Sequence, residues 1–592
     1  MGSEGTNARP APAPPDAPRA RFTRGKRAPR GIVWYGFRSF WGHLQHFVAS
    51  AIATEDIDSR DWMHADDPRQ LARDLAAHLS PKGHDDAKES LTARLGRDLI
   101  IDYLADTGDD ASVAEAVAGL IFRAWELPDP EREGATVTLP RGEILFFGGD
   151  TAYPVATSAE IHDRVVVPFN RVLAKVRHLD PPGTRRALLG IPGNHDWYDG
   201  LDGFGRMFRR RIGELAPDQE PSLEPERESR FEHVVEFVEK FVIGGQVEKQ
   251  KILVLDGYVP LQHAGYFALP LAPGIDLLAV DRQLRGVDFR QRRYFAEWRE
   301  QRRREHLVVA LPDPVYAFQE PSLTGIAMAK ALELDLKHVP HLCISGDVHH
   351  YERLRVDASL HVTSGGGGAF LHPARLGGEG LPRPDAQFPG PRATAALLWR
   401  VPFRVMFGRA GFIPHVVMLA LFAPVLEIGL RLFGTTTTAS ILAGVLGAIF
   451  LALAGDVRSL PRFKAWRVAL IAAIGGVIMG VVPTLSSRGF FRALEALKID
   501  AGARGDMVLT LLLATFVGAF VFGAYLAALT ALGLENTQAF TCLGHPGYKQ
   551  FVRLRVRADG SAIDGFAIGL VDPLESDARP VLVDAWTWRP RP

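Results

Sequence analysis

Four short strings of the sequence combine carboxylates, an amide and imidazoles with a neighbouring glycine. Side chains of these types, when they meet at one point, bind hard or borderline divalent cations. Two cations about 4 Å apart can clamp phosphoryl oxygens and supply a nucleophile, while a nearby histidine protonates the leaving oxygen. The strings are Ala105-Asp106-Thr107-Gly108-Asp109, Gly149-Asp150-Thr151-Ala152-Tyr153, Gly193-Asn194-His195-Asp196, and Gly346-Asp347-Val348-His349-His350-Tyr351-Glu352-Arg353.

These strings lie at or near the ends of short apolar runs. Runs such as Glu143–Phe147, Ala187–Ile191 and His341–Ile344 alternate with helical patterns between about residues 99 and 373. This alternation predicts an α/β layered fold, and open α/β sheets carry their sites at the strand ends. An Asp beside a Gly is by itself often a turn or cap residue. The ordered set, with Gly-Asn-His-Asp after an apolar strand, is far more specific.

The set resembles the motifs of the calcineurin-like metallophosphoesterase superfamily, in the variant seen in purple acid phosphatases. That family uses Asp-x-Gly, Gly-Asp-x-x-Tyr, Gly-Asn-His-Asp/Glu, an isolated His and Gly-His-x-His. The resemblance covers roughly residues 99–375. It implies a four-layer α/β/β/α sandwich and hydrolysis of a phosphomonoester or phosphodiester by metal-activated hydroxide.

The resemblance also implies a dinuclear centre of divalent metal ions. Asp150 would bridge the two ions, and Asn194 would serve the second site. The first site would be completed by Asp106, Tyr153 and His349.

The same resemblance assigns the proton donor. His195, oriented by Asp196, would protonate the leaving group. Arg353 would contact the phosphate or form a structural salt bridge, and the sequence leaves both open.

Two departures from the family pattern concern the second metal site. No histidine stands at Val308–Pro314, where the isolated His is expected, and Asp347 replaces the first His of the last motif. The second site then offers only oxygen ligands, namely Asp150, Asn194 and Asp347, with Asp109 as a supplement. Such a site favours Mn, Mg or Fe over Zn.

Nearby imidazoles and glycines have plainer interpretations. We expect His350 and His372 to be packed or solvent-exposed. The run Gly365–Gly368 lacks the Lys and Ser/Thr of a nucleotide-binding loop, so a tight backbone turn is favoured over a phosphate cradle.

The charge balance and the distribution of apolar residues limit the classes of partner that the chain can have. Lys+Arg and Asp+Glu are 68 each, so no overall field attracts nucleic acid. Charges crowd the first two thirds of the chain, whereas long apolar runs fill residues 412–533. Four segments each reach roughly the twenty residues that cross a bilayer, which predicts a four-helix transmembrane bundle. They are Phe412–Phe433, Thr435–Ala454, Trp466–Leu485 and Met507–Leu532.

Basic residues beside these segments predict the orientation. Arg400, Arg404 and Arg409 precede the first segment, and Arg458, Arg462, Lys464 and Arg467 lie between the second and third. By the positive-inside rule, both termini and the catalytic domain are expected in the cytoplasm, at a plasma or inner membrane. The substrate would then be a membrane-proximal or lipid-linked phosphate ester.

The remaining segments complete the expected domain organisation. Cys343 and Cys542 are expected to be buried thiols rather than a disulfide framework. The expected units are a disordered basic tail (1–30), a helical N-terminal region (31–98), the metallophosphoesterase domain (99–375, with a helical insertion at 206–250), a linker (376–411), the transmembrane helices (412–533) and a C-terminal β-hairpin segment (534–592).

Two other functions compete with the enzyme. The missing second-site imidazoles are also typical of a catalytically impaired sensor or scaffold that keeps a phosphoesterase fold at the membrane. A transporter with a regulatory domain draws little support, because the apolar segments contain few polar residues.

Overall fold

The structure is a computed structural model. Residues 38 and 40–63 of the expected helical N-terminal region, most of the N-terminal tail and most of the insertion at 206–250 lie outside the residues it describes. The described residues are 11–12, 25–37, 39, 64–210, 222–223, 253–283, 286–302, 306–336, 338–377, 383–433, 436–455, 460, 462–499 and 502–590.

The larger of two main sheets has eight strands in the order β1-β19-β18-β17-β2-β5-β6-β7. From β2 to β7 the neighbours are parallel, and β2, β5 and β6 are buried throughout, which accounts for their unbroken apolar runs. From β2 to β19 the neighbours are antiparallel. The strands are β1 (Ala11–Pro12), β2 (Leu99–Leu104), β5 (Ile144–Phe147), β6 (Arg186–Gly190), β7 (Tyr258–Pro260), β17 (Lys549–Val556), β18 (Ile563–Leu570) and β19 (Val581–Trp588).

The second sheet has seven strands in the order β16-β14-β15-β13-β10-β9-β8. Its centre, from β9 to β15, is parallel, and its outer strands pair antiparallel. The strands are β8 (Phe267–Ala272), β9 (Ile275–Ala279), β10 (His306–Leu311), β13 (His341–Ser345), β14 (Tyr351–Val356), β15 (Ser359–Ser364) and β16 (Ala386–Phe388).

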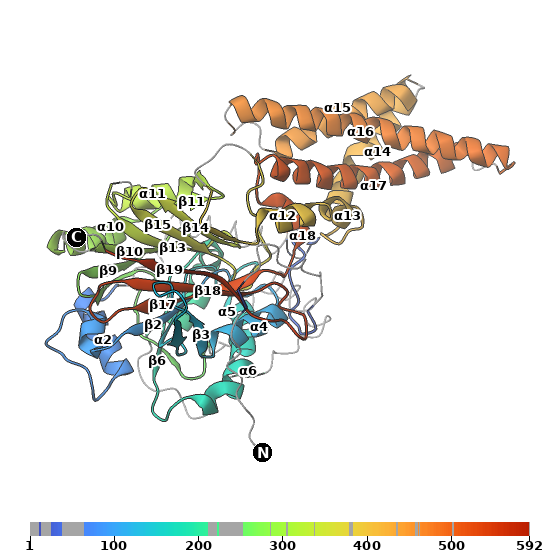
Figure 1. Cartoon of the computed structure of the whole chain (residues 1–592). Helices are drawn as coiled ribbons and strands as arrows, with labels where there is room; N and C mark the ends of the chain where they lie inside the picture. Colours follow the sequence, from blue (N-terminus) through green and yellow to red (C-terminus); the bar gives the residue numbers. More distant parts are fainter. Residues whose placement is uncertain are drawn as a thin grey trace, which may run out of the picture.

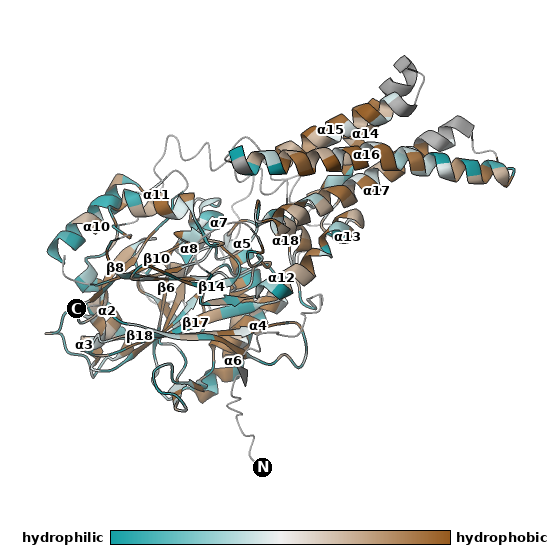
Figure 2. Cartoon of the chain, turned by 45° about the horizontal axis from the view of Figure 1, so that its top comes forward, coloured by the Kyte–Doolittle hydropathy of each residue, from teal (hydrophilic) through white to brown (hydrophobic). Residues whose placement is uncertain are grey.

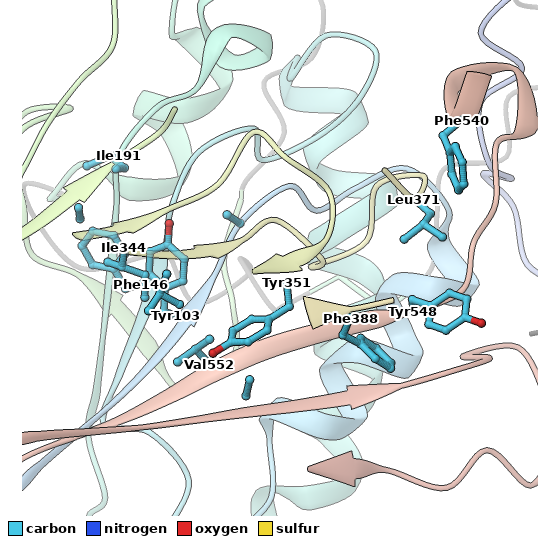
Figure 3. Close-up of a cluster of buried hydrophobic side chains, with 14 of the residues drawn as sticks. Tyr103, Phe146, Ile191, Ile344, Tyr351, Leu371, Phe388, Phe540, Tyr548 and Val552 are labelled. Atoms are coloured by element: carbon cyan, nitrogen blue, oxygen red, sulfur yellow. The ribbon is translucent and has the colours of Figure 1, made fainter. Parts of the chain in front are cut away.

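The two sheets share one buried cluster of side chains (Figure 3). Phe146 of β5 and Phe267 of β8 lie with ring centroids 5.9 Å apart. Tyr351 of β14 donates to Asp584 of β19 at 2.8 Å and accepts from the Trp586 indole at 3.2 Å. Buried aromatic packing and satisfied polar groups therefore join the sheets face to face.

Helices cover the other faces of both sheets. Alternate residues of β2, such as Leu104, pack with α4 (Ala111–Ile121) and α6 (Val167–Val176) in a second buried cluster. In the same cluster, residues of the second sheet pack against α10 (Phe289–Gln301) and α11 (Leu323–Ala331). The fold is thus mixed α/β, as the sequence predicts. Smaller elements are α2 (Pro68–Leu79), α3 (Leu91–Leu95), β3 (Trp125–Pro128), β4 (Thr136–Leu139), α5 (Ser158–Ile161), α7 (Asn194–Trp197), α8 (Asp202–Phe208), β11 (Tyr316–Ala317) and β12 (Glu320–Pro321).

Four apolar helices extend away from the α/β body (Figures 1 and 2). Two stretches of the described residues, Lys464–Ala496 and Val508–Ala531, are long and apolar enough to cross a membrane. The apolar stretches in the other two helices, Ile413–Val425 and Thr438–Ala454, are shorter. The helices are α14 (Ile413–Phe433), α15 (Thr436–Ala454), α16 (Arg462–Ala496) and α17 (Gly502–Ala531).

After these helices the chain returns to the body. Short helices α12 (Pro391–Leu398) and α13 (Val401–Met406) lead into α14, and α18 (Gln538–Leu543) follows α17 and contacts α13. The expected hairpin is β17 and β18, with a turn at Gly560 (φ 73°). Because β17 pairs with β2, the larger sheet is built from chain on both sides of the apolar helices.

Candidate functional site

Three of the predicted ligands adopt the left-handed backbone conformation just beyond a strand. Asp106 follows β2 with φ 57°, Asp150 follows β5 with φ 50°, and Asp347 follows β13 with φ 65°. Non-glycine residues rarely adopt this conformation. The Asp347 amide donates to Asp106 Oδ2 at 2.9 Å, so this contact ties the two sheets together. A shared unusual conformation at three strand ends is typical of a functional site.

The Tyr153 hydroxyl lies between three other predicted ligands. Its oxygen is 2.9 Å from Asp106 Oδ1, 3.3 Å from Asp150 Oδ2 and 3.0 Å from His349 Nε2. All four side chains are buried. His349 Nδ1 lies 2.8 Å from the Phe370 carbonyl, and it must donate to that oxygen. The lone pair of Nε2 therefore faces the Tyr153 hydroxyl, as in a metal-ligating histidine.

Two glycines allow the loops to approach this closely. A Cβ at residue 193 would lie 2.2 Å from Asp150 Oδ1, and one at residue 346 would lie 2.8 Å from Asp106 Oδ2. Any larger residue at Gly193 or Gly346 would displace a predicted ligand, which explains the Gly in both strings.

Asn194, the predicted ligand of the second site, contacts an arginine. Arg282 Nη1 donates to Asn194 Oδ1 and to Asp313 Oδ1, both at 3.1 Å. The Asn194 amide nitrogen in turn donates to the Tyr198 hydroxyl at 3.1 Å. Asp313 lies in the segment where the family pattern places its isolated histidine. Arg282 and Asp313 follow β9 and β10, so the strand-end signal that found the other residues could have found these.

His195, the predicted proton donor, lies half-buried beside Tyr153, with ring centroids 4.4 Å apart. Its amide donates to Asp150 Oδ1 at 2.8 Å, which fixes the first turn of α7 against the predicted bridging ligand. Its Nδ1 lies 2.6 Å from the Pro154 carbonyl, so Nδ1 carries a proton that it donates to this oxygen. Burial lowers the pKa of His195 to about 4, which makes the free imidazole neutral at pH 7.

Asp196 has a different position from the one expected. Its carboxylate accepts the amide protons of Gly193 at 2.9 Å and Thr151 at 3.2 Å. It therefore holds the two ligand loops together, while the Pro154 carbonyl orients the His195 ring. Burial, and next the charge of Asp150, raise the pKa of Asp196 to about 7.

Carboxylates are concentrated around Tyr153 and Arg282. Burial raises the pKa of Asp150 to about 7, and it raises the pKa of Asp106 and Asp347 well above the usual range, with added repulsion from neighbouring carboxylates. Burial also raises the pKa of Asp313. One arginine does not balance four carboxylates, so the cluster is suited to a bound cation.

His350 and His372, which were expected to be packed or solvent-exposed, are both buried. His372 stacks on His349 with centroids 4.0 Å apart and accepts the His349 amide proton at 3.0 Å. His350 Nδ1 lies 2.9 Å from the Pro373 carbonyl. Burial lowers the pKa of His350 to about 4 and that of His372 to about 3, so both imidazoles are neutral at pH 7.

Two further candidates have structural partners. Arg353 pairs with Asp584 at 2.6 Å and with Asp385 at 2.7 Å, so the salt bridge is the interpretation that its contacts support. Asp109 accepts the Ile32 amide proton at 2.7 Å and thereby anchors the N-terminal segment Gly31–Phe37 rather than a second metal site.

The glycine run Gly365–Gly368 and strand β17 pack against the loop that carries Asp106. The Gly367 amide donates to the Ala105 carbonyl at 2.9 Å, and the Gln550 amide donates to Gly366 at 3.0 Å. Lys549 Nζ donates to the Ala369 carbonyl. Burial lowers the pKa of Lys549 to about 7, against the charges of Asp109 and Asp106. No motif in the sequence marks Lys549, because its place depends on the return of the chain after α17.

The donor set around Tyr153 matches a metal ion by ligand type rather than by a closed arrangement of side chains. Among the described residues, no three His, Cys, Asp or Glu side chains close into a ready-made metal cage. The predicted ligands instead meet at the Tyr153 hydroxyl. Two carboxylates, a phenol and an imidazole nitrogen are the ligand types of a hard or borderline cation, and the surplus negative charge favours one. The residues thus fit a divalent cation by their chemistry.

Comparisons with known proteins do not assign this chain to a family. No family model matches the chain, and no curated protein matches it. One solved structure, "GAP50 the anchor in the inner membrane complex of Plasmodium", shares 11% identity over 49% of this chain and 78% of its own, with a TM-score of 0.29. Likeness at that level carries no argument about this chain.

Proposed function

We propose that this chain is a membrane-anchored, metal-dependent phosphoesterase of the calcineurin-like type, acting on a phosphomonoester or phosphodiester. The observation that carries the proposal is the contact of the Tyr153 hydroxyl with Asp106, Asp150 and His349. These residues come from separate strings of the sequence, and the resemblance assigns each of them to one metal centre. We interpret the facing sheets with helices outside them as the four-layer sandwich that the resemblance implies.

The residues have distinct roles in the proposed reaction. A divalent cation held by Asp106, Asp150, Tyr153 and His349 would neutralise phosphoryl charge and activate the attacking water. Asn194, Arg282 and Asp347 are only partly buried and would face the incoming phosphate. His195 Nε2 would deliver a proton to the leaving oxygen. The negative phosphate favours the protonated imidazole and offsets the effect of burial on its pKa.

The membrane proposal rests on the apolar helices and their flanks. We propose that α14 to α17 all cross the bilayer. The chains that enter and leave this region join one sheet through β2 and β17, so the number of crossings must be even. Trp399, Phe403 and Phe407, beside Arg400 and Arg404, are 80%, 50% and 60% exposed, which suits a cytoplasmic membrane interface.

The segment Gly31–Phe37 favours a membrane-proximal substrate. Trp34 lies 6.0 Å from His195 and 5.9 Å from Tyr153 between ring centroids. The next residue, Tyr35, donates its amide to the Ala410 carbonyl at 3.1 Å and accepts from the Ile413 amide at 3.1 Å. Two consecutive residues, Trp34 and Tyr35, therefore link the candidate site to the start of α14. A lipid-linked phosphate ester would reach the site from the bilayer.

The test uses the full chain purified in detergent, with Mn²⁺ and chromogenic phosphate mono- and diesters. We expect metal-dependent turnover that falls at least 10²-fold in Asp150→Asn. The control is Asp559→Asn, in an exposed turn far along the chain, which should keep full activity. Activity that survives Asp150→Asn would overturn the assignment of the site.

The second candidate is a sensor or scaffold without turnover. Two residues favour it. Arg282 lies where the resemblance expects the second ion, and Asp313 lies where it expects an imidazole ligand of that ion. Tight Mn²⁺ binding with no hydrolysis of any phosphate ester would support it over the enzyme.

A further inference from the structure

Arg282 makes contacts that a second metal ion would otherwise make. Its guanidinium bonds Asn194 Oδ1 and Asp313 Oδ1, both at 3.1 Å. The Tyr198 hydroxyl accepts from the Asn194 amide nitrogen, and this bond keeps the Asn194 oxygen directed at the guanidinium. A positively charged group is thus already hydrogen-bonded to Asn194, one of the oxygen ligands that the sequence offers for a second ion, and to Asp313 beside it.

The surrounding charges favour a permanent cation at this point. A guanidinium stays protonated in proteins, and Nη1 of Arg282 lies 3.1 Å from the carboxylate of Asp313. The Asp313 side chain is 2% exposed and that of Arg282 is 23% exposed. Breaking such a buried pair would leave an uncompensated carboxylate, so the arginine is held firmly in place.

The guanidinium of Arg282 also has N–H donors that can bind a ligand. It has five N–H donors, and the protein bonds above use one nitrogen, Nη1. The partly exposed edge can form the paired hydrogen bonds to phosphoryl oxygens for which arginine is suited. This explains how the site can lack both second-site imidazoles. Where the cation is an arginine, the carboxylates of Asp313 and Asp347 stand in their places.

We propose that the Arg282 guanidinium takes the place of the second metal ion, so that the centre binds one ion per chain and Arg282 supplies the second positive charge to the phosphoryl group. This inference rests on the proposed function and replaces the dinuclear centre of the resemblance by a mononuclear one.

Metal stoichiometry tests the inference apart from activity. The purified full chain is loaded with Mn²⁺ alone, freed of excess, and analysed by elemental mass spectrometry and electron paramagnetic resonance. Wild-type protein should hold one ion with the six-line spectrum of isolated Mn²⁺. Arg282→Ala should admit a second ion and show the spectrum of a coupled pair, whereas Arg282→Lys, which keeps a cation, should hold one.

The matched control is Arg293→Ala, on the exposed face of α10, where the side chain is 66% exposed and pairs with Glu297. It should leave the count at one. Two coupled ions in the wild type would overturn the inference and leave the proposed function standing. One ion in both wild type and a folded Arg282→Ala would also overturn it. A wild type that binds no Mn²⁺ would overturn the proposed function itself, and if Arg282→Ala does not fold, the wild-type and Arg282→Lys counts still decide.

Discussion

Arg553 of β17 and Asp102 of β2 form an ion pair with no exposed side-chain surface on either partner. Arg553 Nε lies 2.6 Å from Asp102 Oδ1, and Nη2 lies 3.0 Å from Oδ2. The remaining donors reach the carbonyls of Ile121 and Arg123 at 2.7 and 2.8 Å. The pair joins strands that precede and follow the apolar helices, and its donors and acceptors are satisfied, as a buried pair requires.

Replacing one member of this pair should destabilise the α/β body. We expect Arg553→Met to cost about 3–5 kcal/mol, because it leaves a buried carboxylate unpaired. The double variant Asp102→Leu with Arg553→Met should recover much of that loss. Urea unfolding followed by tryptophan fluorescence measures both. Arg97→Met, which breaks the more exposed pair with Glu143, should cost less than about 1 kcal/mol, and an equal cost for Arg97 and Arg553 would contradict this account.

The shared sheet predicts that chain on either side of the apolar helices lies on one side of the membrane. In a variant without Cys343 and Cys542, single cysteines at the exposed residues Glu89 and Ser561 should react with an impermeant maleimide from the same side of sealed vesicles. Labelling from opposite sides would mean that an odd number of helices crosses, which the pairing of β17 with β2 forbids.

The role of His195 predicts a dependence on the leaving group. His195→Ala should slow alkyl phosphate hydrolysis about 10²–10⁴-fold. Esters of strongly acidic phenols should be affected far less, since their oxygen leaves without a proton. The measurement is the slope of log kcat/KM against leaving-group pKa, which should steepen in the variant. His338→Ala, at a side chain that is 73% exposed, should keep the wild-type slope, and so would His195→Ala if its role were only structural.

The Tyr153 hydroxyl should contribute to metal affinity. Tyr153→Phe keeps the ring against His195 but removes the oxygen that contacts Asp106, Asp150 and His349. We expect the Kd for Mn²⁺ to rise about 10–100-fold, measured by titration calorimetry. Tyr316→Phe, which lies away from these ligands beside His361, is the control. An unchanged Kd in Tyr153→Phe would remove Tyr153 from the ligand set.

His361 predicts a loss of stability in acid. Burial lowers its pKa to about 3, with a smaller effect from His341, whose ring lies 5.0 Å away. Between pH 6.5 and 3 the unfolded chain binds the proton and the folded chain does not, so stability falls as pH drops through that window. In His361→Leu the urea midpoint should fall less between pH 7 and pH 4.5 than in the wild type. Parallel decreases in both proteins would show that other groups dominate.

The sequence predicted the features that follow from local pattern. Asp106, Asp150 and Asp347 were found because each follows a buried apolar strand beside a glycine, and α/β sheets carry their sites at strand ends. The apolar segments were found because length and composition alone distinguish them. The mixed α/β class followed from the alternation of strand and helix patterns.

Only the tertiary structure decided which distant residues complete the site. Lys549 and Arg553 lie more than 440 residues from Asp106 and Asp102 in sequence, as the separation of 451 between Arg553 and Asp102 illustrates, and no local periodicity encodes the pairing of β17 with β2. Arg282 and Asp313 carry the same strand-end signal as the ligands. The hydrogen bonds that Arg282 donates to Asp313 and to Asn194 nevertheless depend on how neighbouring strands of the second sheet face the first. Short-range pattern fixes which residues end a strand, whereas the packing of one sheet on another fixes which of those ends meet.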